Sequence, residues 1–160
     1  MDADRKRKQN KNKRNVNIVK WRLKCYGEDL ELLDSLKERI SIKRDKMDLK
    51  GGWSDSEAVQ GGGSTQEDKL NALLDDITKA ERTMTMIELE NRAIKYSIDS
   101  LPDEDMKSIV YHVWAKDDKT MEQMSQELHL SKTNVWRKSD AALLYIYKKM
   151  AIIDPFISED

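Results

Sequence analysis

Residues 120–143, TMEQMSQELHLSKTNVWRKSDAAL, contain the clearest local indications of secondary structure in the chain. Thr120 and Gln123 have the three-residue spacing of a capping box, which marks the first turn of a helix. Ser131 is a good N-cap for a second helix that begins directly after it. The stretch therefore predicts two helices joined by a tight turn.

The apolar residues of this stretch predict how the two helices pack. Met121, Met124 and Leu128 fall on one face of the first helix, and Leu130 is expected to fill the corner between the helices. Ser125 is small enough for the second helix to cross closely at that point. The residues of the second helix that are expected to face inward are Val135, Ala142 and Leu143.

The outward face of the second helix is polar and basic. Lysine, arginine, asparagine and threonine side chains at an exposed helix start can bond base edges and phosphates in a DNA major groove. A helical hairpin that packs only against protein is the alternative interpretation. The residues that we expect to contact DNA are Thr120, Ser131, Lys132, Thr133, Asn134, Arg137 and Lys138.

Residues 1–14 are dense in basic side chains and have no apolar periodicity. Like charges with nothing to bury predict an arm that is disordered on its own. The arm either contacts DNA phosphates, with an affinity that falls steeply as salt is added, or acts as a solubilising tail. The candidate phosphate-contacting residues are Arg5, Lys6, Arg7, Lys8, Lys11, Lys13 and Arg14.

Residues 15–99 carry two apolar stripes, which predict two long helices. The first stripe consists of Val19, Leu23, Tyr26, Leu30, Leu33 and Ile40, and the second of Leu70, Leu73, Ile77, Ala80, Met84, Ile87, Ile94 and Ile98. The Gly-rich stretch 51–65 between them is typical of a linker, and Ser64 or Thr65 can cap the second helix. An antiparallel hairpin is the simplest arrangement. Because such a pair buries only one seam of side chains, we expect it to self-associate.

Two residues within the predicted helices are exceptions to the apolar pattern or to helix propensity. Gly27 is a weakness inside the first helix, worth about 1 kcal/mol relative to Ala. Asn91 falls on the second stripe, where it either fixes the register of a coiled coil or lies at an exposed turn.

A further helix is expected to follow Ser100, with Ser100 as its cap and Pro102 early in its first turn. Residues 100–152 then form a compact helical domain, and residues 153–160 form an acidic tail. The predicted fold class is all-α: a long, coiled-coil-like helical hairpin followed by a C-terminal helix-turn-helix domain.

The pattern from Thr120 to Val135, preceded by Leu101-Pro102 and followed by Ala142-Leu143, resembles the region 4 helix-turn-helix of bacterial sigma-70 factors. That family binds promoter DNA, so the resemblance implies DNA binding and contact with host RNA polymerase. His129 stands where such turns usually have Gly, a position that often needs a positive φ.

The layout of the whole chain resembles small phage transcriptional regulators of the ArpU and RinA type. It has a basic start, a long helix, a Gly-rich break, a second long helix and then the helix-turn-helix. That resemblance implies control of late phage or prophage genes.

The sequence offers little support for an enzyme, a cofactor or a metal site. Cys25 is the only cysteine, and neither His112 nor His129 has a Cys, Asp, Glu or second His three or four residues away. No apolar run approaches the length of a membrane span, so we expect a cytoplasmic protein inside a bacterial host cell.

The four tryptophans do not suggest a ligand site. Trp114 is expected to lie in the core, and Trp136 to pack on its own domain rather than touch a DNA backbone. Trp53, in the linker, is a candidate anchor for the hairpin or a partner.

The expected function is sequence-specific binding of double-stranded DNA by an oligomeric transcriptional regulator. The alternative is a DNA-packaging protein similar to a terminase small subunit, which also joins a helix-turn-helix to helical oligomerisation segments. A coiled coil that binds only protein is a third hypothesis.

Overall fold

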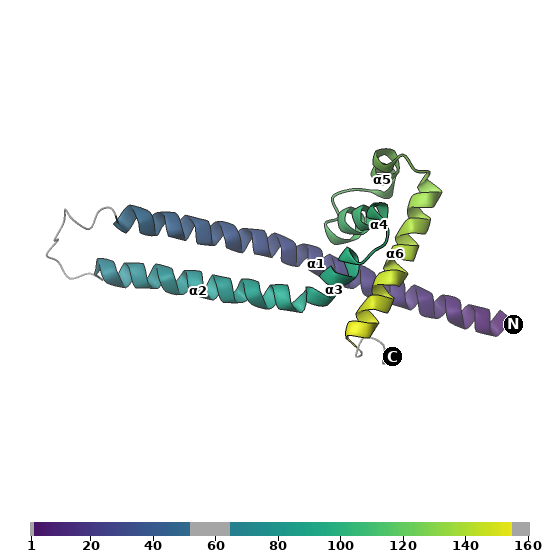
Figure 1. Cartoon of the computed structure of the whole chain (residues 1–160), viewed down its shortest axis with the longest axis horizontal. Helices are drawn as coiled ribbons and strands as arrows, with labels where there is room; N and C mark the ends of the chain where they lie inside the picture. The colour runs from purple at the N-terminus through teal and green to yellow at the C-terminus, as the bar shows by residue number, and fades with distance from the viewer. Residues whose placement is uncertain (1, 52–64, 155–160) are drawn as a thin grey trace. The chain divides into compact units, whose positions relative to one another are not determined.

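The computed structural model describes residues 2–51 and 65–154, and within these ranges it is helical and contains no strand. The all-α prediction is therefore confirmed. The elements are α1 (Asp2–Gly51), α2 (Gln66–Glu90), α3 (Arg92–Asp99), α4 (Glu104–Ile109), a π-helix η1 (Val110–Ala115), α5 (Met121–Leu128) and α6 (Lys132–Ile153) (Figure 1).

The chain divides into two compact units, and α1 contributes to both. The first unit contains Met1–Leu30 and Glu90–Asp160, and the second contains Glu31–Leu89. This division differs from the prediction that residues 15–99 form a hairpin apart from a domain at residues 100–152. The reason is that apolar residues near the start of α1 and in α3 pack into the same core as α6.

The first unit is built around two clusters of buried side chains. The larger cluster joins α1, α3 and α6 and includes Val19, Leu23, Tyr26, Ile94, Ile98, Leu143, Ile146 and Met150. The smaller joins α4, α5 and α6 and consists of Ile109, Met121, Met124 and Val135. Trp114 packs against both clusters, and its Nε1 donates to Ser139 Oγ at 2.8 Å. Trp114 therefore belongs to the core, as the sequence indicated.

Gly27 lies where α1 passes the end of η1 within the first unit. A Cβ atom built on Gly27 would lie 1.7 Å from the carbonyl oxygen of Ala115. No side chain fits there, because real Cβ atoms do not approach other heavy atoms so closely. The glycine is thus required for close packing between α1 and the backbone of η1.

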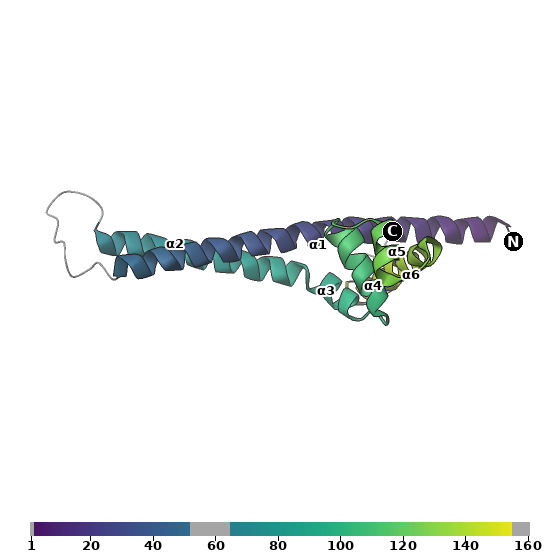
Figure 2. The same cartoon turned by 90° about the horizontal axis from the view of Figure 1, so that it is seen from above.

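The second unit is an antiparallel pair formed by the later part of α1 and by α2 (Figures 1 and 2). Ile40, Ile77 and Ala80 are buried between the two helices. Lys43 forms an ion pair with Asp76, and the Arg44 Nη2 atom lies 2.9 Å from Glu81 Oε1. The hairpin predicted from the two stripes is thereby confirmed for residues 31–89.

The first turn of α2 is closed by Thr65 and Asp68. The Thr65 hydroxyl accepts from Asp68 N, and the Asp68 carboxylate accepts from Thr65 N, both at 3.2 Å. Of the two predicted caps, Thr65 is the one that the structure shows, whereas Ser64 lies outside the described residues. The rest of the linker, with Trp53, and the tail residues 155–160 also lie outside them.

Asn91 separates α2 from α3. Its φ and ψ angles are −92° and 2°, and its Nδ2 donates to Asp29 Oδ2 on α1 at 2.6 Å. Asn91 therefore sits at a helix break, as one interpretation held. It also makes a polar contact with α1, so it is not merely an exposed turn residue.

Residues 2–14 form the first turns of α1 rather than a disordered arm. Lysine, arginine and glutamine are good helix formers, and Asp2 and Asp4 lie near the positive end of the helix dipole. The turns also continue a helix whose inner face is buried from Asn15 onward, so they need no nucleus of their own.

The cap predicted at Ser100 is wrong. Ser100 ends α3, where its Oγ donates to Tyr96 O at 2.7 Å. The cap of α4 is Asp103, whose carboxylate accepts from Asp105 N at 2.9 Å. The helix begins later than predicted because Pro102 disfavours helical angles at the residue before it.

Candidate nucleic-acid interface

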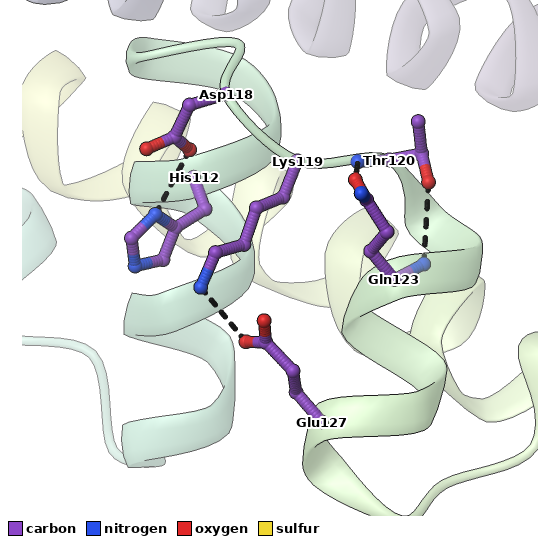
Figure 3. Close-up of polar contacts among 6 residues, drawn as sticks. All are labelled: His112, Asp118, Lys119, Thr120, Gln123 and Glu127. Atoms are coloured by element: carbon purple, nitrogen blue, oxygen red, sulfur yellow. Dashed lines mark hydrogen bonds and ion pairs between the residues drawn. The ribbon is translucent and has the colours of Figure 1, made fainter.

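The first helix of the helix-turn-helix, α5, begins with the predicted capping box. Thr120 Oγ1 accepts from Gln123 N at 3.2 Å, and Gln123 Oε1 accepts from Thr120 N at 2.8 Å (Figure 3). The Thr120 hydroxyl is therefore already an acceptor within the cap. It can still donate its proton to a phosphate.

The loop that leads into α5 is fixed by two polar contacts that the sequence analysis missed. His112 Nδ1 lies 2.9 Å from Asp118 Oδ1, and Lys119 Nζ lies 2.8 Å from Glu127 Oε2 (Figure 3). The hydrogen bond to His112 lowers the pKa of the Asp118 carboxyl. These partners are six and eight residues apart, beyond the spacing at which a regular helix brings side chains together, so no local pattern indicated them.

His129, in the turn between α5 and α6, has the left-handed backbone conformation that its position in the turn predicts. His129 has φ 53° and ψ 40°. Leu130 N donates to Ser125 O at 3.1 Å, and Ser125 Oγ donates to Leu130 O at 2.6 Å. Ser125 thus ties the turn to α5, and Leu130 packs against the smaller cluster as predicted.

The second helix, α6, begins at the predicted cap. Ser131 Oγ accepts from Asn134 N at 3.2 Å. Val135, Ala142 and Leu143 are fully buried, which confirms their inward orientation. The first turns of α6 are therefore held by a cap at one end and by core packing along one side.

Four of the predicted DNA-contacting side chains lie exposed on the first turns of α6, namely Lys132, Thr133, Asn134 and Arg137. They combine two cations, an amide and a hydroxyl. Because a regular helix carries them, their Cα atoms have a fixed spacing along one face. The structure places Ser131 beside them at the cap.

Lys138 does not belong to this exposed group. Its ammonium forms an ion pair with Asp103, and it lies 3.5 Å from Asp105 Oδ2. The hydrogen bond with Asp103 raises the pKa of Lys138 and lowers the pKa of Asp103. Lys138 thus links α6 to the start of α4. The sequence could not show this, because the partners are 35 residues apart.

The ion pair between Lys138 and Asp103 predicts an acid-dependent contribution to stability. The folded pKa of Asp103 lies below its ordinary value of 3.8, so the contribution is present above that pH and is lost as the pH falls through the lowered pKa. Asp103→Asn keeps the capping ability but removes the charge. The wild-type protein should therefore be more stable than this variant at neutral pH, and the difference should shrink below pH 3.8.

Urea unfolding followed between about pH 3 and 7 measures this difference. A gap between the two proteins that stays constant throughout that range would show that the ion pair contributes nothing.

Trp136 is 43% exposed and belongs to neither core cluster. Its predicted packing on its own domain is therefore partial. It lies one turn after Lys132 and Thr133, so its indole borders the exposed polar group. The apolar surface of an indole suits contact with a thymine methyl group or a deoxyribose.

The basic residues near the start of α1 are exposed from Arg5 to Arg14. They belong to the same unit as α6.

Among the described residues, no group of three or more His, Cys, Asp and Glu side chains could hold a metal ion. None of the described helices is long and apolar enough to cross a membrane.

Comparison of the chain with protein-family models, curated proteins and solved structures finds no match. The resemblances to sigma-70 region 4 and to the ArpU and RinA regulators therefore stay predictions.

Proposed function

We propose that the protein is a sequence-specific DNA-binding transcriptional regulator that places the start of α6 in a major groove. One observation carries this proposal: α6 has an exposed polar face and, on its other side, a fully buried apolar face. A recognition helix needs both, because base contacts require side chains held in register by a rigid scaffold.

The exposed side chains match the chemistry of base edges. Arg137 can donate two hydrogen bonds to the O6 and N7 atoms of a guanine, and Asn134 can pair with the N6 and N7 atoms of an adenine. Lys132 and Thr133, nearer the start of the helix, suit phosphates or bases. The caps at Thr120 and Ser131 fix the orientation of α5 and α6 beneath these contacts.

Arg137→Ala should weaken binding to a preferred site by about 1 to 3 kcal/mol, roughly 5- to 150-fold, because the bidentate contact with guanine is lost. Fluorescence anisotropy with the preferred duplex, and with a duplex altered at the contacted base pair, measures both affinity and selectivity. The matched control is Lys148→Ala, which removes an exposed cation from the far half of the same helix. Unchanged affinity and unchanged selectivity would remove Arg137 from the recognition face.

Resemblance to phage regulators and to sigma-70 region 4 supports a narrower proposal, in which the protein controls late phage or prophage genes and contacts host RNA polymerase. Purified polymerase should then bind the protein or gain activity at the target promoter. If polymerase does neither, this part of the proposal is abandoned, whereas DNA recognition by α6 is unaffected.

The second unit supports a proposal of self-association. Its helices expose large apolar side chains, with exposed fractions between 45% and 67%, at Leu32, Ile42, Leu49, Leu74, Met86 and Leu89. A second copy would cover some of this surface and present two α6 helices to DNA. A dimer in sedimentation experiments fits a regulator of this kind. Ring-sized assemblies would instead favour a DNA-packaging component.

A further inference from the structure

The first turns of α1 concentrate positive charge on a helix. Residues 5–27 contain ten Lys and Arg side chains and no Asp or Glu. All of this segment is helical, and every side chain from Asp2 to Arg14 is exposed. We call Arg5, Lys6, Arg7, Lys8, Lys11 and Lys13 the basic turns.

The basic turns have no acidic partner among residues 2–51 and 65–154. None of the ion pairs described there involves one of these six side chains. Like charges also meet along the helix, as at Arg7 and Lys11, which are four residues apart, and such pairs destabilise a helix. An external polyanion would relieve this repulsion.

The composition of the basic turns favours nucleic acid over a membrane or a protein groove. Ala3 is the only apolar side chain between Asp2 and Arg14, so this stretch has no apolar face to insert into lipid or to pack on a partner. Besides the cations and Asp4, the stretch contains Gln9, Asn10 and Asn12, whose amides can bond phosphate and base atoms.

The basic turns are rigidly connected to the core that holds α6. Val19 and Leu23, on the same helix, are buried in one cluster with Leu143 and Ile146 of α6. In both views the basic turns and the beginning of α6 lie on the right-hand side of the first unit, and in Figure 1 the beginning of α6 lies above α1, next to α5 (Figures 1 and 2). One duplex would have to span from the beginning of α6 to the basic turns to contact both.

We propose that the basic turns bind the phosphate backbone of the same DNA duplex that α6 recognises. This inference rests on the proposed function, because it takes the ligand of α6 to be duplex DNA. The basic turns supply affinity that does not depend on base sequence, whereas α6 supplies selectivity. Each phosphate that a cation neutralises releases counterions, so the contacts must appear in the salt dependence of binding.

The test compares wild type with a variant carrying Lys6→Gln, Lys8→Gln, Lys11→Gln and Lys13→Gln. Glutamine keeps a helix-forming side chain and removes only the charge. The matched control carries Lys37→Gln, Arg39→Gln, Lys46→Gln and Lys79→Gln, which removes the same charge from exposed positions in the second unit. Affinity is measured between about 50 and 200 mM salt for a preferred duplex and for a scrambled duplex of equal length.

The slope of log K against log salt concentration should become shallower by about 0.9 for each lost phosphate contact, up to roughly 3 to 4 units for the variant of the basic turns. Affinity should fall equally for both duplexes, so that the preference for the chosen site is kept. The control variant should match wild type. A slope that changes no more than in the control would overturn the inference while leaving the role of α6 intact.

The remaining outcomes separate the two proposals. If the wild type shows no preference between duplexes but its slope still depends on the basic turns, the proposed function fails and the phosphate contact stands. If the wild type binds neither duplex, both fail. Tighter binding to vesicles of anionic phospholipid than to DNA, lost in the variant of the basic turns, would overturn DNA as the ligand.

Discussion

Gly27→Ala should destabilise the first unit by about 1 to 3 kcal/mol or more, as is typical when a methyl group is forced into a packed interface. At an exposed site within a helix the same substitution would stabilise the protein by about 1 kcal/mol. Here the new Cβ would lie 1.7 Å from Ala115 O, and the obstacle is backbone rather than a movable side chain. Either α1 or the end of η1 must shift, and both pack on the core around α6.

Urea unfolding of the full chain, monitored by circular dichroism, measures this effect. Glu28→Ala is the matched control, because Glu28 is exposed on the next position of α1 and its replacement should change stability little. A Gly27→Ala protein at least as stable as wild type would mean that α1 does not pass so close to η1.

Leu23→Ala should cost about 2 to 5 kcal/mol in the free energy of unfolding, because it leaves a cavity in the larger cluster of the first unit. Leu23 is fully buried there, together with Leu143 and Ile146 of α6. The substitution tests whether the start of α1 belongs to the same folded unit as the helix-turn-helix. A separate domain at residues 100–152 would be insensitive to it.

Leu32→Ala provides the comparison for Leu23→Ala, since Leu32 lies on the same helix but is 45% exposed. Hydrogen exchange locates the effect: Leu23→Ala should reduce the protection of α6 amides, and Leu32→Ala should not. Equal loss of stability in the two variants, with α6 protection unchanged in both, would contradict the division into units.

The parts of the site that sequence could predict are those set by neighbours within a few residues. The capping box at Thr120 and Gln123, the cap at Ser131 and the left-handed His129 all depend on local spacing, and all are present. The apolar stripes likewise indicated the helices and the paired seam of the second unit, because their period follows helix geometry.

The features that sequence could not predict depend on residues far apart along the chain. The sequence predicts that Lys138 contacts DNA, because no local pattern indicates its ion pair with Asp103, which lies 35 positions away. Gly27 looked like a weakness because the backbone that it meets belongs to η1. The packing of α1 on α6 joins residues separated by more than a hundred positions, so helical periodicity alone could not assign the two to one unit.

Recognition of a DNA sequence by the first turns of α6 is tested most directly by selecting and sequencing fragments of the source genome that purified, folded protein binds at near-physiological salt. We expect one enriched site upstream of a block of genes, with the enrichment lost when Arg137 is replaced by Ala. Enrichment at a packaging start would point instead to the DNA-packaging alternative. No enrichment with folded wild-type protein would contradict DNA recognition by α6.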